Sequence, residues 1–417
     1  MLKLNSHAKG LMAAAAIAAM VPAIAALTQF AQAQDAPAAG RGAGGQGGGR
    51  GAAQPPGPRS EGDRALVNPY AVNQTWYTMP KGRYLGSSSA IDIDNDGTSV
   101  WVAERCGGQD LCAGSSVNPV FRLNAQGRIT AQFGADMISY PHGIHVDKDN
   151  NIWVADLQSN IDNAARAGRG NFPNPAPGSV KNVAGAQILK FSPQGKLLLR
   201  IGTPGVYGKD ATHLSQPSDM VTSPVTGEVF VSDVHDTQPA NNRIVVFDKN
   251  GKYLREWACD PGSRGLDCSH GIAMDSRGYI YSANRAQSRV DVFDQNGKLL
   301  HMWPQFGSAT GAFIDKNDIL YVSDSNSGPT SSYLRGIHIG SARTGIVTAF
   351  IPDPLGISAP WTGASTLSPE GVTADAQGNV FTASVRPQGI TRWSIRTTTR
   401  PFPAPAGRGG RGGDGGE

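Results

Sequence analysis

Two histidines occupy the same position of a repeated sequence pattern. The stretches His142 to Asp156 and His270 to Asn284 both begin with His-Gly-Ile and continue as a period-two apolar strand, a tight turn and a second strand. Glu370 begins another copy of this pattern. Two imidazoles and one carboxylate, with coordination positions left open, are the ligands of catalytic zinc sites and of non-haem iron(II) sites. The three residues are therefore predicted to bind a metal ion together.

The pattern around these residues is a β-hairpin that occurs six times. The six hairpins cover Ala90 to Glu104, His142 to Asp156, Ser218 to Asp233, His270 to Asn284, Thr310 to Asp324 and Glu370 to Ser384. After most hairpins come a third strand, a turn of the form Phe-Asp-x-Asn-Gly-Lys and a fourth strand. A four-stranded unit repeated at a spacing of roughly 40 to 60 residues is typical of a β-propeller. We therefore predict an all-β fold, a six-bladed β-propeller, and not a β-sandwich, which does not repeat one residue pattern in register.

The first strand of every propeller blade lines the central channel, so residues at equivalent first-strand positions form a ring. The ring that contains the two histidines consists of Ser89, His142, Ser218, His270, Thr310 and Glu370. Its histidines and its glutamate come from alternate blades, about 120° apart in a sixfold ring, and are expected to converge. Other interpretations stay open for single members. A histidine there can be a hydrogen-bonding plug, Glu370 can pair with an arginine, and His145 is expected to face the channel as an additional group.

A second ring is expected where the second strand of each hairpin ends. Its positions are Arg105, Leu157, Val234, Arg285, Ser325 and Val385. Arg105 and Arg285 lie at equal register and are expected to flank the same face as the metal site. Arginine binds carboxylates through two parallel hydrogen bonds, so the pair predicts a small anionic or peptide-derived substrate. The alternative for each arginine is a salt bridge to a neighbouring aspartate, such as Asp156 or Asp233.

The propeller domain is expected to extend over residues 66–396, and its last blade lacks one strand. A strand at Thr75 to Met79 is predicted to supply it and to close the ring. Residues 34–65 and 397–417 are rich in small residues, Pro and Arg and lack the aliphatic side chains needed for a core, so both are predicted to be disordered. Their arginines lack aromatic partners, and the formal charge of the chain is only +4, so no nucleic-acid partner is expected.

Residues 1–33 have the features of a secretory signal peptide. They combine a basic start at Lys3, an apolar stretch from Leu11 to Leu27, and the small-residue sequence Ala31-Gln32-Ala33. We therefore predict a secreted or periplasmic protein that is a monomer and has no stable membrane insertion after cleavage. The alternative for this segment is an N-terminal membrane anchor.

The four cysteines form two pairs that are close in sequence, Cys106 with Cys112 and Cys259 with Cys268. An exported protein meets an oxidising environment, so two disulfides with this pairing are predicted. A zinc site built from all four thiolates is the weaker alternative, because the spacing is not Cys-x-x-Cys. In each pair one cysteine lies within two residues of a predicted site residue.

Taken together, these residues resemble the peptidyl-α-hydroxyglycine amidating lyase family, a six-bladed propeller of the NHL-repeat type. The resemblance runs over roughly Ser88 to Ile395. Its most specific stretches are Tyr140-Pro141-His142-Gly143-Ile144, Gln216-Pro217-Ser218-Asp219 and His270-Gly271-Ile272. The resemblance implies a lyase that cleaves the C–N bond of a carbinolamide and releases glyoxylate and an amide.

In that family three histidines from alternate blades hold a zinc ion, and the resemblance implies that His142 and His270 are the first two. The third corresponds to Glu370, and His-His-Glu remains a competent zinc set. The aspartate of the family's structural calcium site corresponds to Gly371. Calcium is therefore not expected from the resemblance, although backbone oxygens around Ile144 remain as ligands.

The resemblance further implies that Arg105 and Arg285 are active-site arginines. The family's catalytic tyrosine corresponds to His235, which implies that an imidazole acts as the base and that the substrate differs. Two other functions stay open for a ring of this kind. One is a metal-dependent hydrolase similar to the gluconolactonases, which use a carboxylate, asparagine and aspartate metal set. The other is a non-catalytic binding propeller.

Overall fold

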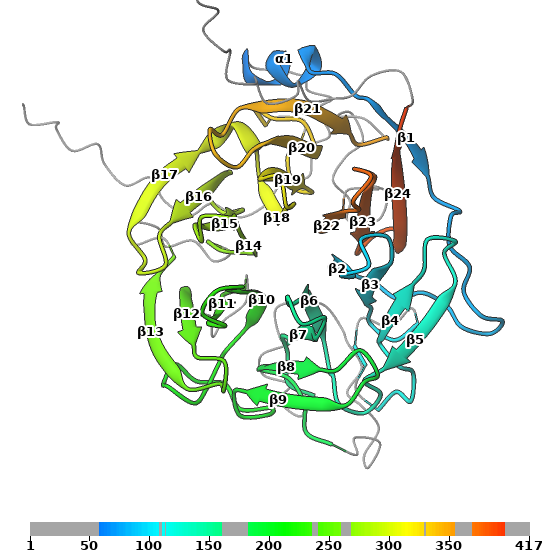
Figure 1. The fold of residues 1–417 in the computed structure, drawn as a ribbon, viewed down its shortest axis with the longest axis vertical. Coiled ribbons are helices and arrows are strands. Elements are labelled where there is room, and N and C mark those ends of the chain that lie inside the picture. Colours follow the sequence, from blue (N-terminus) through cyan, green and yellow to red (C-terminus); the bar gives the residue numbers. More distant parts are fainter. Residues whose placement is uncertain are drawn as a thin grey trace, which may run out of the picture. The chain divides into compact units, whose positions relative to one another are not determined.

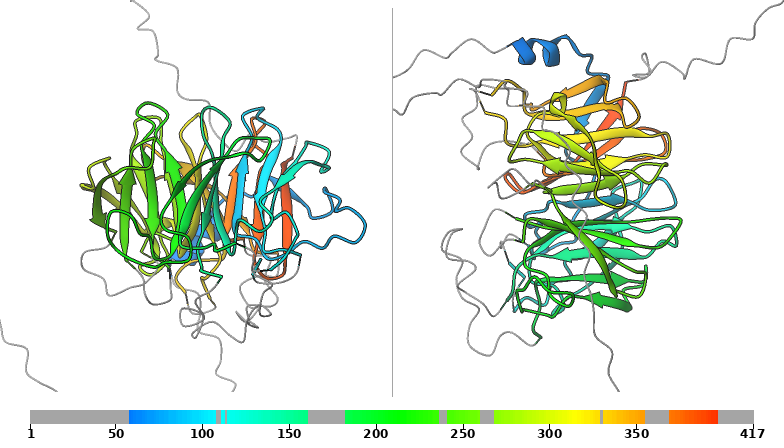
Figure 2. Two further views of the ribbon diagram at one scale, coloured as in Figure 1. Left: turned by 90° about the horizontal axis from the view of Figure 1, so that it is seen from below. Right: turned by 90° about the vertical axis from the view of Figure 1, so that its left-hand side faces the viewer.

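The computed structural model describes residues 58–107, 111–112, 114–160, 182–235, 241–259, 268–328, 331–354 and 369–396. Within these residues the chain forms six four-stranded antiparallel sheets around a central channel (Figure 1). The side views show the strands of each sheet running between the two faces of the ring (Figure 2). The predicted six-bladed β-propeller is therefore confirmed. The expected signal peptide and C-terminal tail lie outside the described residues.

Five of the six blades are built from four consecutive strands. In chain order these strands are β2 (Ala90–Ile93), β3 (Val100–Ala103), β4 (Val120–Leu123), β5 (Ile129–Phe133), β6 (Pro141–Val146), β7 (Ile152–Asp156), β8 (Gln187–Phe191), β9 (Leu197–Ile201), β10 (Pro217–Thr222), β11 (Val229–Asp233), β12 (Arg243–Phe247), β13 (Tyr253–Ala258), β14 (Gly271–Met274), β15 (Ile280–Asn284), β16 (Arg289–Phe293), β17 (Leu299–Trp303), β18 (Ala309–Ile314), β19 (Ile319–Asp324), β20 (Gly336–Ser341) and β21 (Val347–Pro352). The sixth blade consists of β22 (Gly371–Ala374), β23 (Val380–Ser384), β24 (Gly389–Ile395) and the N-terminal strand β1 (Tyr70–Asn73). A short 3-10 helix, η2 (Pro304–Phe306), follows β17.

A repeated aspartate explains where the chain turns in five of the six hairpins, and Ser223 takes its place in the third. Asp147 follows β6, and its carboxylate accepts backbone N–H groups from the turn and the indole N–H of Trp153 at 3.0 Å. Asp94 does the same for Trp101 at 2.8 Å. The turn and the aromatic side chain of the second strand are thereby fixed together, which is why the Asp and Trp or Tyr positions recur in the repeat.

Neighbouring blades share their hydrophobic cores. Phe133 of the first blade packs against Trp101 of the same blade and against Phe191 of the second, with ring centroids 5.6 and 5.0 Å apart. The other interblade clusters are built in the same way from the side chains of two adjacent sheets. A single blade therefore has an unburied apolar face until its neighbour is present, as expected for a repeat fold.

The glycine after each ring histidine allows the first strands to approach closely. A Cβ atom at Gly143 would collide with Asp219 of the next blade, and one at Gly271 would meet the backbone of Thr310 and Gly311. The His-Gly pair is thus a packing requirement as well as a chemical signal. Only a residue without a side chain fits where two inner strands touch at the hub.

The ring closes through β1, at a position that differs from the predicted one. Strand β1 pairs antiparallel with β24, with Tyr70 opposite Ile395 and Asn73 opposite Arg392. The predicted closing segment, Thr75 to Met79, instead contributes one parallel bridge from Thr78 to Arg128 of the first blade. The expectation that an N-terminal strand completes the last blade is confirmed, and the choice of segment was wrong.

A short helix precedes the ring. Helix α1 (Pro58–Ala65) lies within the segment that was expected to be disordered. Its buried Asp63 accepts the backbone N–H of Leu334 at 3.0 Å and lies 3.2 Å from Nε2 of His338, both on the fifth blade. These contacts attach the helix to the propeller, which composition alone did not indicate. No helix among the described residues is long and apolar enough to cross a membrane.

The closure by β1 gives a direct stability prediction. Tyr70 is 1% exposed and packs in the cluster between the fifth and sixth blades, so Tyr70→Ala should lower the free energy of unfolding by about 3 kcal/mol. Thr75→Ala, in the exposed segment just beyond β1, is the matched control and should change it by less than about 0.5 kcal/mol. Chemical unfolding followed by tryptophan fluorescence measures both. Equal effects of the two variants would contradict this closure.

Candidate metal centre and anion site

Three histidines converge at one end of the channel. His142 lies in β6, His235 follows β11, and His270 precedes β14. All three are 2–3% exposed, and one ring nitrogen from each lies within 4.8 Å of the others. The ring centroids are 4.7, 4.7 and 5.2 Å apart. Buried imidazoles this close together form a candidate metal centre.

Backbone carbonyls of the next blade orient two of these rings. Nδ1 of His142 lies 2.8 Å from the carbonyl oxygen of Ser218, and Nδ1 of His270 lies 2.9 Å from that of Thr310. A carbonyl oxygen can only accept a hydrogen bond, so both Nδ1 atoms carry the proton. The lone pair of each ring is then on Nε2. This tautomer and this partner are typical of histidines that bind metal through Nε2.

The spacing of the nitrogens fits a metal ion. Nε2 of His235 lies 3.0 Å from Nε2 of His142. Two imidazole nitrogens bound to a tetrahedral zinc at about 2.0–2.1 Å are about 3.3 Å apart, so a shift of a few tenths of an ångström adapts the pair. The triple-histidine site is thus compatible with a metal. Its neutral donor set suits a divalent ion for which imidazole is a preferred ligand.

The group that the structure brings together differs from the predicted one by one residue. Among the described residues, His235 and not Glu370 completes the cluster with the two ring histidines. The carboxylate of Glu370 lies 3.9 Å from Nη1 of Arg285. This ion pair is the alternative that the sequence left open for Glu370. Register places the backbone of Glu370 on the ring, but the opposite charge of a neighbouring arginine attracts its side chain.

His145, the other ring candidate, lies away from this cluster. Its Nε2 is 2.9 Å from the hydroxyl of Thr222, and its Nδ1 is 3.4 Å from the carboxylate of Asp92. These contacts join three neighbouring first strands further along the channel. His145 therefore belongs to the lining of the channel rather than to the triple-histidine site.

Arg105 is buried beside the cluster without a carboxylate partner. It is 3% exposed, and its guanidinium lies 4.0 Å from the ring centroid of Tyr140. Its Nη2 donates to the hydroxyl of Ser89 at 3.3 Å, and that hydroxyl donates to the backbone carbonyl of His142 at 2.7 Å. Among the described residues no acidic group pairs with Arg105, and its Nε makes no hydrogen bond. A buried cation in this situation is suited to bind an anion.

The aspartates proposed as salt-bridge partners of the arginines have other roles. Asp156 accepts four hydrogen bonds, from the backbone N–H groups of Ser139, Tyr140 and Gly185 and from the Gln187 amide. Burial raises the pKa of Asp156 to about 6, and these donors oppose the shift. Asp233 pairs with Arg243 at 2.9 Å. Both carboxylates shape the loops that carry the site.

The channel continues from the cluster as a cavity of about 1130 Å³. Its lining includes His142 and His270 at one end and the polar residues Asp92, His145 and Asp219 further along. Burial raises the pKa of Asp219 to about 8, and the charge of Asp92 adds to this, although backbone N–H groups of Ile272 and Met220 lower it. The two oxygens of Asp219 accept these N–H groups at 3.0 Å each, so the carboxyl group links the neighbouring first strands β10 and β14.

Both predicted disulfides are present. Cys106 is bonded to Cys112 and Cys259 to Cys268, with Cα–Cα distances of 5.1 and 5.7 Å. No free cysteine remains, so the four-thiolate zinc site is excluded. The first disulfide follows Arg105 directly in sequence, and the second ends two residues before His270.

The chain is similar to amidating enzymes of animals. Peptidyl-glycine alpha-amidating monooxygenase of Mus musculus is 32% identical over 126 residues, which are 30% of this chain and 10% of that protein. Peptidyl-alpha-hydroxyglycine alpha-amidating lyase 2 of Drosophila melanogaster is 29% identical over 159 residues, 38% of this chain and 32% of that protein. The resemblance to amidating lyases that the sequence predicted is therefore confirmed over this part of the chain. The chain matches only a minor part of the length of these relatives.

No model of a known protein family matches the chain. Among solved structures, a streptogramin B lyase aligns with 78% of this chain and 98% of its own, at a TM-score of 0.46 and 14% identity. Virginiamycin B lyase from Staphylococcus aureus aligns with 78% and 85%, at a TM-score of 0.44 and 14% identity.

The two candidate ligand sets predict different metal contents for single variants. Changing His142, His235 or His270 to Ala should weaken zinc affinity at least about 100-fold, beyond the 10- to 100-fold typical of a residue that only orients a ligand. Glu370→Gln and His145→Gln are the controls and should keep one zinc per chain. Competition with a chromogenic chelator measures the affinity. Zinc loss in Glu370→Gln together with zinc retention in His235→Ala would favour the ligand set predicted from sequence.

Proposed function

We propose that this protein is a zinc-dependent carbon–nitrogen lyase that converts an N-acyl-α-hydroxyglycine into glyoxylate and a primary amide. The observation that carries the proposal is a combination of two features. Three imidazoles converge, and beside them lies a buried Arg105 that no acidic side chain among the described residues neutralises. The lyase-named relatives support the choice of reaction. A metal-binding group and an anion-binding group on one face match a substrate with a hydroxyl next to a carboxylate.

Arg105 binds the substrate carboxylate in this proposal. The stacked Tyr140 ring fixes the plane of the guanidinium, and Ser89 holds Nη2. A fixed planar guanidinium suits two parallel hydrogen bonds to a carboxylate. Arg285 adds a second positive charge on the same face, partly neutralised by Glu370. The α-hydroxyl group is attached to the same carbon as the carboxylate. When the carboxylate is bound by Arg105, the hydroxyl group lies toward the histidines.

The roles of His235 and Glu370 are exchanged relative to the sequence prediction. With Nε2 only 3.0 Å from that of His142, His235 is placed to be the third ligand. Glu370 is then the carboxylate that is available as a base. Its side chain is 20% exposed, and its ion pair with Arg285 is a long one, at 3.9 Å. It takes the proton from the α-hydroxyl, the C–O bond becomes the aldehyde of glyoxylate, and the C–N bond breaks. The amide nitrogen keeps the electron pair and receives the proton.

His142, His235 and His270 would hold the metal. When bound, a zinc ion supplies a Lewis acid that makes the α-hydroxyl easier to deprotonate. Three neutral imidazoles leave the full charge of the ion available for this purpose. The same set accepts iron(II), and zinc is proposed because the reaction transfers no electrons.

We also infer that the protein works outside the cytoplasm. Its two disulfides are of the kind that persists in oxidising compartments. The N-terminal residues 1–33 have the composition of a secretory signal. We propose a monomeric, exported enzyme that acts on a small or peptide-derived anion.

The test is turnover of an N-acyl-α-hydroxyglycine by the zinc-loaded protein, with glyoxylate and primary amide quantified by mass spectrometry. Equal amounts of both products are expected. Glu370→Gln should lower kcat by about 100-fold or more, the usual weight of a general base, while zinc content stays at one per chain. Arg285→Ala should lower turnover and also leave zinc in place.

The controls separate this function from its alternatives. His145→Gln, in the channel but outside the cluster, should retain turnover. Hydrolysis of a sugar lactone without glyoxylate release would indicate a lactonase. A metal-free protein that turns over neither substrate would indicate a binding propeller. Loss of zinc from Arg285→Ala would mean that this residue supports the metal rather than the substrate.

A further inference from the structure

We propose that the Cys106–Cys112 disulfide is a positioning device for Arg105, which fixes the guanidinium against Tyr140 so that it can bind the substrate's carboxylate. This inference rests on the proposed function for the identity of the anion. The positioning itself depends only on contacts among described residues.

The loop that carries Arg105 reverses direction directly after it. Cys106 and Gly107 both have left-handed backbone conformations, with φ of 51° and 75°. The buried carboxylate of Glu104 accepts the N–H of Gly107 at 2.8 Å and that of Gly86 at 2.6 Å. One side chain thereby bonds the backbone just after Arg105 and the neighbouring segment at Gly86. The N–H of Arg105 itself donates to Ser87 at 2.9 Å.

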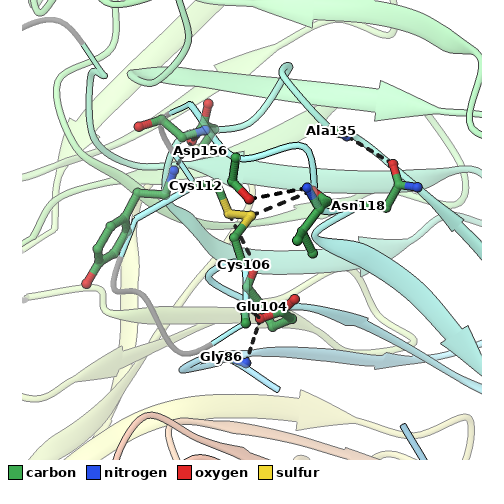
Figure 3. The surroundings of a disulfide bond; sticks show 12 residues. Gly86, Glu104, Cys106, Cys112, Asn118, Ala135 and Asp156 are labelled. Atoms are coloured by element: carbon green, nitrogen blue, oxygen red, sulfur yellow. Dashed lines mark hydrogen bonds between the residues drawn. A yellow bond between two sulfur atoms is a disulfide. The ribbon is translucent and has the colours of Figure 1, made fainter. Parts of the chain in front are cut away.

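The disulfide joins this reversal to Cys112, a residue of the same loop that contacts the second blade. The N–H of Cys112 donates to the carbonyl of Ser139 at 2.7 Å. Ser139 immediately precedes Tyr140, and the N–H groups of both donate to Asp156. Figure 3 shows the disulfide between Glu104 on one side and Asp156 on the other. The bond therefore ties the residue after Arg105 to Cys112, whose backbone N–H contacts the residue before the aromatic partner of Arg105.

Apolar packing supports the same link. Leu111, the residue before Cys112, is 8% exposed and forms a small buried cluster with Tyr140 and Leu157. Tyr140 thus packs with Leu111 next to the disulfide, while the guanidinium of Arg105 lies 4.0 Å from the centroid of the Tyr140 ring. Arg105 and Tyr140 belong to separate blades, and the disulfide ties the residue after Arg105 to the two residues, Leu111 and Cys112, that contact the Tyr140 segment.

Holding Arg105 in place has an energetic reason. A buried guanidinium without an anionic partner is better solvated if the loop opens toward water. A stacking contact with one aromatic ring compensates only part of this cost. The covalent bond between Cys106 and Cys112 opposes such an opening next to Arg105 and keeps the cation inside the site. Preorganisation of this kind strengthens binding because the ordering is complete before the ligand arrives.

The experiment compares Cys106→Ser/Cys112→Ser with the matched control Cys259→Ser/Cys268→Ser, which removes the other disulfide. Phenylglyoxal modification of arginines, followed by peptide mass spectrometry, reports the accessibility of Arg105. We expect the first variant to raise the modification rate of Arg105 about tenfold through local opening, and the control to leave it unchanged. Zinc content should stay at one per chain in both.

Kinetics give the second readout. Loss of one hydrogen bond to a charged group corresponds to about tenfold in affinity, so KM should rise about tenfold in the first variant with kcat within about twofold. Tyr140→Leu keeps the apolar cluster, removes the aromatic face, and should also raise Arg105 reactivity. If the disulfide variant does not fold, Tyr140→Leu tests the same contact between Arg105 and the Tyr140 ring.

An unchanged Arg105 reactivity in a folded disulfide variant would overturn the proposal, and so would an unchanged reactivity in Tyr140→Leu where the disulfide variant does not fold. An equal rise in the Cys259→Ser/Cys268→Ser control would also overturn it, because it would indicate general loosening of the fold. Absence of glyoxylate release from the wild type would instead refute the proposed function, while the arginine modification rates still decide the positioning role.

Discussion

The site depends on hydrogen bonds from two imidazoles to the backbone of the next blade. By donating Nδ1–H to the carbonyls of Ser218 and Thr310, His142 and His270 are fixed in rotation and tautomer. Their Nε2 lone pairs then have a defined direction, and His235 can meet them. Because both carbonyls belong to neighbouring first strands, this orientation exists only when the blades are assembled side by side. The chemistry of the hub is therefore a property of the closed ring.

Closure of the ring and assembly of the site are thus coupled. The glycines that follow the ring residues let adjacent inner strands touch, and buried carboxylates at the ends of second strands hold the loops above them. Asp156 is a clear case, because its four donors come from the loop before β6, from the loop before β8 and from Gln187 at the start of β8. A buried carboxyl is expensive in an apolar surrounding, and here it organises two site loops at once.

Much of this arrangement could be predicted from the sequence, and the limits have physical causes. Hairpin periodicity gave the propeller, and cysteine spacing gave both disulfides, because each depends on residues near in sequence. The closing strand was misplaced because three of the four residues of β1 are exposed, so it has no alternating apolar pattern, whereas Thr75 to Met79 has a more strand-like composition.

The presence of His235 rather than Glu370 in the histidine cluster was missed for a different reason. Register locates a backbone position on the ring, but the direction of a side chain depends on the charges around it. Glu370 faces Arg285, which belongs to another blade, and His235 reaches the hub from the end of a second strand. Tyr140 was part of the most specific sequence stretch, yet its contact with Arg105 joins two blades and leaves no periodic signal. Contacts between repeats are what a repeat pattern does not encode.

The measurement that tests the central claim most directly is X-ray absorption at the zinc edge of the loaded protein, for the wild type and for His235→Gln. A centre built from three imidazoles predicts three nitrogen ligands at about 2.0 Å with outer-shell scattering from three rings, falling to two rings in the variant. Two rings plus a carboxylate oxygen in the wild type, unchanged in His235→Gln, would contradict the account.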